Sequence, residues 1–229
     1  MSLIDEFGPA LHIADGPDVS FFGFPYPTRM AVVNLSDGGT WIWSPIALTD
    51  ELADAVDALG PVRYIVAPNK LHHLFLRQWI DRWPQAMLFA APGLARRRRD
   101  IRFDRTLSDT AEPEWARDID QVIFRGSFAM EEAVFFHRAS STAIFCDLIQ
   151  RFPPRYLKGW KGALLKIDDL AGEHGSTPRE WRASFLHRAR ARAARRRVLD
   201  WKPRQLVIAH GDCARANATA IISDALRWI

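Results

Sequence analysis

The feature that most constrains the fold is a series of short, almost wholly apolar runs separated by helical segments. Residues 63–67, 87–90 and 205–210 read RYIVA, MLFA and QLVIAH. Strands of this kind are expected to be covered on both faces. Further strands are predicted at 31–35, 40–43, 121–124, 133–137 and 142–147, with a hairpin turn at 138–141 joining the last two. We therefore predict an α/β fold in which helices cover the sheets.

Capping residues mark the predicted helices. Thr49, followed by Asp50 and Glu51, is typical of a helix start, and Gly60 of its end. Other helices are predicted at 71–83, after Pro92, and at 156–170, 178–199 and 214–228, whereas residues 100–118 are expected to wrap irregularly over the surface. Because no linker or repeat interrupts this order, residues 1–229 are predicted to form a single domain.

Charge and composition narrow the classes of function. The chain lacks an apolar run of the ~18 residues that a membrane span needs, and its N-terminus does not resemble a signal peptide. Together with only two cysteines, this predicts a cytoplasmic protein without a membrane partner. Arginine is concentrated at 96–99 and 179–197, but neither cluster has the regularly interleaved aromatic residues of a nucleic-acid platform. A solvated helix face is the favoured interpretation, and a nucleic-acid partner is not favoured.

Titratable and polar side chains gather where the predicted buried strands end. Asn69, Lys70, His72 and His73 follow the strand at 63–67, while Asp147 and His210 end two later strands. Imidazole and carboxylate groups are ligands that suit a first-row metal such as zinc. Spacing alone leaves helix capping, packing or a hydrogen-bond network as alternatives for these residues. His137 lies inside a strand and is interpreted as structural.

The sequence resembles the metallo-β-lactamase superfamily, and more closely a bacterial branch of it whose function is unknown. The resemblance runs from about Leu11 to the C-terminus and rests on residues 24–30, SPIALTDEL, LGPVRYIVAPNKLHHLFL, FAAPGL, DQVIFRGSF, EAVFFHR, FCDL and IAHGD. It implies a four-layer αββα sandwich with metals at one edge between the two sheets. The usual reaction of the superfamily is hydrolysis of an ester, thioester, amide or phosphodiester by metal-activated water.

The resemblance implies an incomplete metal-binding motif. The superfamily pattern His-x-His-x-Asp-His falls on residues 68–73, where Pro68 and Lys70 replace the first two histidines and His72 replaces the aspartate. His73 keeps the final histidine of the motif. Asp147 and His210 keep the bridging aspartate and the last histidine, and residues 126–130 contain no histidine. One of the two metal positions is therefore lost.

The favoured hypothesis is a hydrolase that binds one metal ion, zinc or iron, through His72, His73, Asp147 and His210. Lys70 or Asn69 would orient or polarise the substrate. Four protein ligands are typical of closed, structural zinc sites, which argues against this hypothesis. The alternative is a non-catalytic protein without metal that binds a small molecule or a protein in the former cleft, with Lys70 in place of the cation. Substrate and oligomeric state stay open.

Overall fold

The computed structural model describes residues 3–21, 23–153, 156, 162, 165, 169–172 and 174–229. Within them one sheet runs in the order β1 (Asp5–Gly8), β2 (Leu11–Phe21), β3 (Phe24–Asn34), β4 (Thr40–Trp43), β5 (Val62–Ala67), β6 (Met87–Ala90) and β7 (Arg105–Thr106). The second sheet runs β11 (Gln205–Ile208), β10 (Thr142–Phe145), β9 (Glu132–His137) and β8 (Ile119–Phe124). The helices are α1 (Asp50–Asp57), α2 (Leu76–Arg82), α3 (Leu94–Arg97), α5 (Arg179–Ser184), α6 (Arg188–Asp200) and α7 (Ala218–Ala225).

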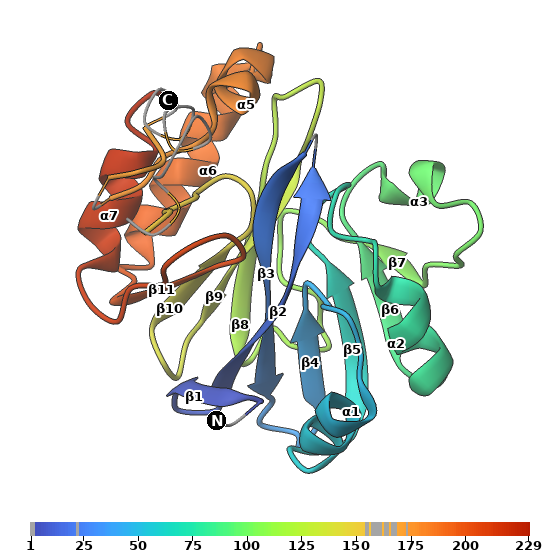
Figure 1. Cartoon of the computed structure of the whole chain (residues 1–229). Coiled ribbons are helices and arrows are strands. Elements are labelled where there is room, and N and C mark those ends of the chain that lie inside the picture. Colours follow the sequence, from blue (N-terminus) through green and yellow to red (C-terminus); the bar gives the residue numbers. More distant parts are fainter. Residues whose placement is uncertain are drawn as a thin grey trace.

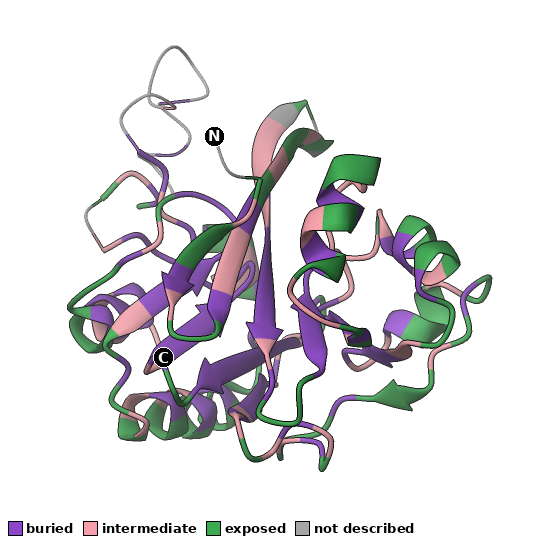
Figure 2. Cartoon of the chain, turned by 90° about the horizontal axis from the view of Figure 1, so that it is seen from below, coloured by how far each residue is buried: buried purple, intermediate pink, exposed green. Residues whose placement is uncertain are grey.

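Three buried apolar clusters hold these elements together as four layers. One cluster packs α1 and α2 onto the first sheet through residues such as Val56 and Trp79. A second lies between the sheets and contains Trp41 and Phe135. The third packs α6 and α7 onto the second sheet (Figure 1). The strands are largely buried while the outer helix faces are exposed (Figure 2), so the predicted αββα sandwich is confirmed.

Parallel pairing brings the ends of several strands to one edge of the molecule. Strand β5 runs parallel to β4 and β6, and β10 runs parallel to β11. The two sheets are joined at this edge, because the backbone N–H of Ala133 donates to the carbonyl of Pro68 at 2.8 Å. The loops that carry the predicted site residues therefore meet there.

The N-terminal region contains more strand than the sequence indicates. Only residues 31–35 are predicted as a strand there, yet β2 and β3 form one antiparallel ribbon with partners from Leu11↔Val33 to Phe21↔Phe24. The glycine and prolines in this stretch favour turns in a sequence-based reading. The register instead shifts between Gly16 and Val19, a bulge that accommodates Pro17 beside the pairing.

Three predicted helices have boundaries that differ from those in the structure. The helix predicted at 71–83 begins at Leu76, since residues 71–75 form turns. The helix predicted at 178–199 is interrupted between α5 and α6, where Phe185 is buried and pairs with Ser127. The closing helix begins at Ala218, later than the predicted residue 214, after Asn217.

Other predictions have mixed outcomes. Thr49 caps α1 by accepting a hydrogen bond from the Leu52 N–H at 3.2 Å, as expected. The segment 100–118 does not only cover the surface, because Trp115 inserts between the sheets with 1% exposure. Most of the helix predicted at 156–170 lies outside the described residues. None of the described helices has the length and apolar character needed to cross a lipid bilayer.

Candidate metal centre

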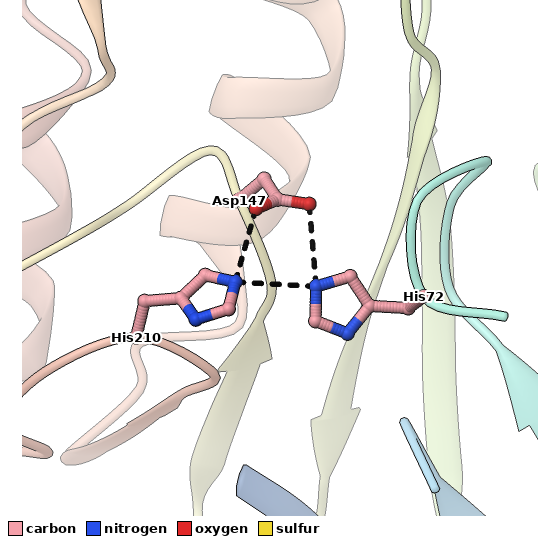
Figure 3. A group of neighbouring side chains, drawn as sticks. All are labelled: His72, Asp147 and His210. Carbon is pink, nitrogen blue, oxygen red and sulfur yellow. Dashed lines mark hydrogen bonds and ion pairs between the residues drawn. The ribbon is translucent and has the colours of Figure 1, made fainter. Parts of the chain in front are cut away.

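Three of the predicted metal ligands converge at the edge where the sheets meet (Figure 3). His210 Nε2 lies 3.1 Å from Asp147 Oδ1, and His72 Nε2 lies 3.4 Å from Asp147 Oδ2. The two Nε2 atoms are 3.2 Å apart. The side chains come from the loop after β5, the segment after β10 and the segment after β11. Asp147 and His210 are each 4% exposed, so the centre is largely shielded from water.

These separations suit a tetrahedral metal ion. Zinc bonds of about 2.0–2.1 Å place neighbouring tetrahedral ligands about 3.3–3.4 Å apart. The observed separations of 3.1, 3.2 and 3.4 Å need only small adjustments to reach that arrangement. Two imidazoles and one carboxylate are also a donor set that suits zinc or iron. The residues therefore fit one ion.

The orientation of His210 supports the same assignment. Its Nδ1 lies 2.7 Å from the carbonyl oxygen of Pro27. A carbonyl can only accept, so Nδ1 carries a proton and the neutral ring has a bare Nε2. Nε2 faces Asp147 Oδ1 at 3.1 Å, so either a proton or a metal ion must lie between these two acceptor atoms. A metal ion would bond to both of them.

Neighbouring polar groups hold His72 in place. Ser44 Oγ lies 2.7 Å from His72 Nδ1, and a hydroxyl can donate or accept there. Asn69 Oδ1 accepts from the backbone N–H groups of Leu71 and His72, at 2.8 and 3.2 Å. The same Asn69 donates through Nδ2 to Asp147 Oδ2 at 2.6 Å. One buried amide thus fixes the His72 turn relative to the Asp147 carboxylate.

A second buried carboxylate supports the segment that carries Asp147. Glu132 accepts from three consecutive backbone N–H groups, those of Cys146, Asp147 and Leu148, at 2.8, 2.7 and 3.1 Å. Burial and the neighbouring charge of Asp147 raise the pKa of Glu132 to about 8. Burial also acts to raise the pKa of Asp147, but contacts with His72 and then His210 outweigh it and hold that pKa well below its usual range. A cation at the centre would stabilise the buried, ionised carboxylate of Asp147.

The structure places His73 and Lys70 differently from the other predicted site residues. Arg98 Nη1 lies 3.0 Å from His73 Nδ1 and donates to the His73 carbonyl at 2.9 Å. Burial, and then the charges of Arg97 and Arg98, lower the pKa of His73. Lys70 lies against Gly93, where an added Cβ would be 2.5 Å from Lys70 Cε. Among the described residues, the side chain of Asp147 contacts Asn69, His72 and His210, and neither His73 nor Lys70 belongs to this set.

Three supporting groups are absent from the predicted site. Glu132 lies just before the strand predicted at 133–137, although an acidic residue beside the buried run AVFF indicates a group that needs partners inside the protein. Ser44 directly follows the strand predicted at 40–43, and nothing in its position predicts its contact with His72. The Pro27 carbonyl carries no sequence signal, because its contact with His210 joins residues 183 positions apart.

One protein-family model matches the sequence. The model described as Domain of unknown function (DUF4336) matches residues 20–164, which is more than half of the chain. The chain belongs to this family. A search of curated proteins gives no match.

This DUF4336 member is similar in fold to several solved structures. A metallo-β-lactamase from Pontibacter korlensis is 13% identical with a TM-score of 0.66, and the alignment covers 98% of both chains. One from Erythrobacter litoralis is 12% identical with a TM-score of 0.66, covering 99% of this chain and 96% of the other. The FIM-1 enzyme from Pseudomonas aeruginosa, solved in a mono-zinc form, is 12% identical with a TM-score of 0.58, covering 97% and 93%. At these identities the likeness establishes a metallo-β-lactamase-like fold.

Proposed function

We propose that the protein is a metal-dependent hydrolase in which His72, Asp147 and His210 hold one zinc or iron ion. The observation that carries the proposal is the convergence of two imidazole nitrogens and a carboxylate at mutual separations of 3.1–3.4 Å. Three protein ligands, two of them histidines, are the number found in catalytic zinc sites, which keep a position for water or substrate. His73 was the fourth predicted ligand, and its side chain contacts Arg98. The proposed site therefore has three protein ligands, and the objection that four ligands would close it does not apply.

The residues around the centre keep its donor atoms in place before substrate binds. Pro27 fixes the His210 ring, Ser44 contacts the outer nitrogen of His72, and Asn69 ties His72 to Asp147. A bound zinc ion would polarise a substrate oxygen and lower the pKa of water toward about 7. Lys70 and Asn69 as substrate-orienting groups stay predictions, and the geometry favours a positioning role for Asn69.

Metal content tests the proposal directly. The protein is purified without nickel or chelator, and zinc and iron per chain are measured by mass spectrometry. We expect about one equivalent in the wild type, because three ligands converge, and a loss in His72→Ala and in His210→Ala. His73→Ala is the matched control, since it removes the adjacent imidazole that contacts Arg98; it is expected to keep the metal.

Two results would contradict the proposal. Retention of the ion in both His72→Ala and His210→Ala would place it elsewhere. A wild-type protein that contains no metal and gains no thermal stability on adding zinc would also contradict it, because a ligand that binds only the folded state at 100 times its Kd stabilises by about 2.7 kcal/mol. That second result would favour the non-catalytic alternative.

A further inference from the structure

A cavity of about 220 Å³ opens beside His72, Asp147 and His210. It could hold about seven water-sized groups at about 30 Å³ each. Its walls come from β2, β3, the loops after β4 and β5, and α5. The apolar lining residues are Val19, Tyr26, Pro45, Ile46, Leu71, Leu74, Phe75 and Trp181. Any molecule that reacts at the centre must occupy this space.

The charge lining the cavity is balanced. Apart from Asp147 and the histidines, the charged residues among its described lining are Arg97 and Glu180, which carry opposite signs. Both are exposed. Beyond the proposed ion at the centre, an anionic substrate would therefore find no excess of cations along the wall to offset the cost of its desolvation.

Three other basic residues lie near the edge. Arg98 forms an ion pair with Asp100 at 2.7 Å, and the Lys70 side chain packs against Gly93. Arg29 pairs with Asp15 at 2.7 Å and donates to the carbonyls of Ile208 and Gly211. None of these three basic residues lines the cavity. Apart from the proposed ion, the lining thus offers a phosphodiester only Arg97 as the arginine or lysine partner that its charge calls for.

From the apolar wall, the balanced charge and the position of the centre, we propose that the substrate is an uncharged carboxylic ester with a short apolar acyl chain. The inference rests on the proposed function, and it narrows the substrate class of that site. The acyl chain would lie along the wall that includes Ile46, Phe75 and Trp181, with the ester carbonyl beside His72 and His210. Burial of apolar surface then supplies the selectivity.

The reaction is hydrolysis with water as the second substrate. The oxygen of water forms a bond to the acyl carbon, and the bond from that carbon to the alcohol oxygen breaks. The electron pair of the broken bond stays with the alcohol oxygen, which takes one proton from the water. The other proton leaves as the carboxylic acid ionises, so the products are a carboxylate, an alcohol and a proton.

The experiment uses the full, zinc-loaded chain and p-nitrophenyl esters of two, four, six and eight carbons, with bis(p-nitrophenyl) phosphate as the anionic probe. Each methylene that enters the cavity is expected to raise kcat/KM by about fourfold. The rise should level off near the longest chain because the cavity is small. We expect little turnover of the phosphodiester. Calorimetry on the metal-free protein should show binding of hexanamide and none of diethyl phosphate.

Matched variants test the wall itself. Leu74 lines the cavity and is 60% exposed, so Leu74→Asp should fold and should weaken the dependence on chain length. Leu186 is 70% exposed and does not line the cavity, so Leu186→Asp should behave as wild type. In calorimetry, hexanamide should bind more weakly to Leu74→Asp than to wild type, and Leu186→Asp should bind it as wild type does.

The outcomes separate the two proposals. A protein that retains zinc through His72 and His210 but prefers the phosphodiester, shows no dependence on chain length, or hydrolyses none of the esters overturns the inference and leaves the metal centre standing. A protein that retains no metal overturns the proposed function, and the inference falls with it. Equal effects of Leu74→Asp and Leu186→Asp would refute the role of the apolar wall.

Discussion

Replacing His137 with Gln removes a titrating group from the interior of the second sheet. His137 is 1% exposed, and its Nδ1 lies 2.8 Å from Ser140 Oγ. Because Ser140 donates its own proton to Thr142 at 2.7 Å, His137 is the donor in the first bond and can be neutral. Burial lowers the pKa of His137 from 6.5 to about 4, against a smaller opposing influence of Asp118.

The sign of the pH effect follows from these two values. The unfolded chain takes up a proton at this histidine near pH 6.5, whereas the folded chain does so only near pH 4. Between them the unfolded state binds more protons, so the free energy of unfolding falls as the pH falls. At about 1.36 kcal/mol per pKa unit, the full penalty is about 3.4 kcal/mol below pH 4, and about 2 kcal/mol of it develops between pH 7 and pH 5.

Urea unfolding of wild type and His137→Gln at pH 7, 6 and 5 measures this penalty as a difference between two proteins. Glutamine does not titrate and can still hydrogen-bond to Ser140, so the variant should lose about 2 kcal/mol less than wild type over this range. His187→Gln, which removes an exposed imidazole, is the control and should follow wild type. If the His137→Gln and wild-type stabilities change in parallel with pH, the assignment of a buried, neutral His137 is refuted.

Two further predictions concern the centre and the core. Asn69→Ala leaves the N–H groups of Leu71 and His72 without their acceptor, so zinc affinity, measured by competition with a chelator, should fall about 10–100-fold; an unchanged affinity would exclude the positioning role. Trp115→Ala should lower the free energy of unfolding in urea by about 3–5 kcal/mol, because the ring fills space between the sheets 4.6 Å from the Phe89 ring. A loss below about 1 kcal/mol would contradict that packing.

Much of the fold could be predicted because its information is local. Buried strands such as β5 and β11 are largely apolar, and Thr49 is a cap whose partner lies three residues away. The β2–β3 ribbon could not be predicted in the same way. Its residues include turn-forming glycine and prolines, and only pairing with each other makes them a strand.

The same distinction between local and long-range information applies to the candidate site. The sequence placed His72, Asp147 and His210 at strand ends, and parallel pairing brings strand ends to one edge, so a shared centre was predictable. His73 was predicted as a ligand together with them, because the sequence of two adjacent histidines in a loop does not indicate which way each side chain points. In the non-catalytic alternative Lys70 takes the place of the cation, which stays a prediction; its side chain packs against Gly93.

The sequence by itself determined the alternation of strands and helices and the loops that carry the candidate site, because hydrophobic period and capping act over a few residues. The four-layer class was implied by the resemblance to the metallo-β-lactamase superfamily. Only the tertiary structure decided which side chains of those loops meet. Asn69 turns the chain by binding two backbone N–H groups and Asp147, a partner 78 positions away. The Pro68–Ala133 hydrogen bond fixes the same loop to the second sheet. Such contacts depend on the approach of distant segments, and they direct His72 to the centre while His73 faces Arg98.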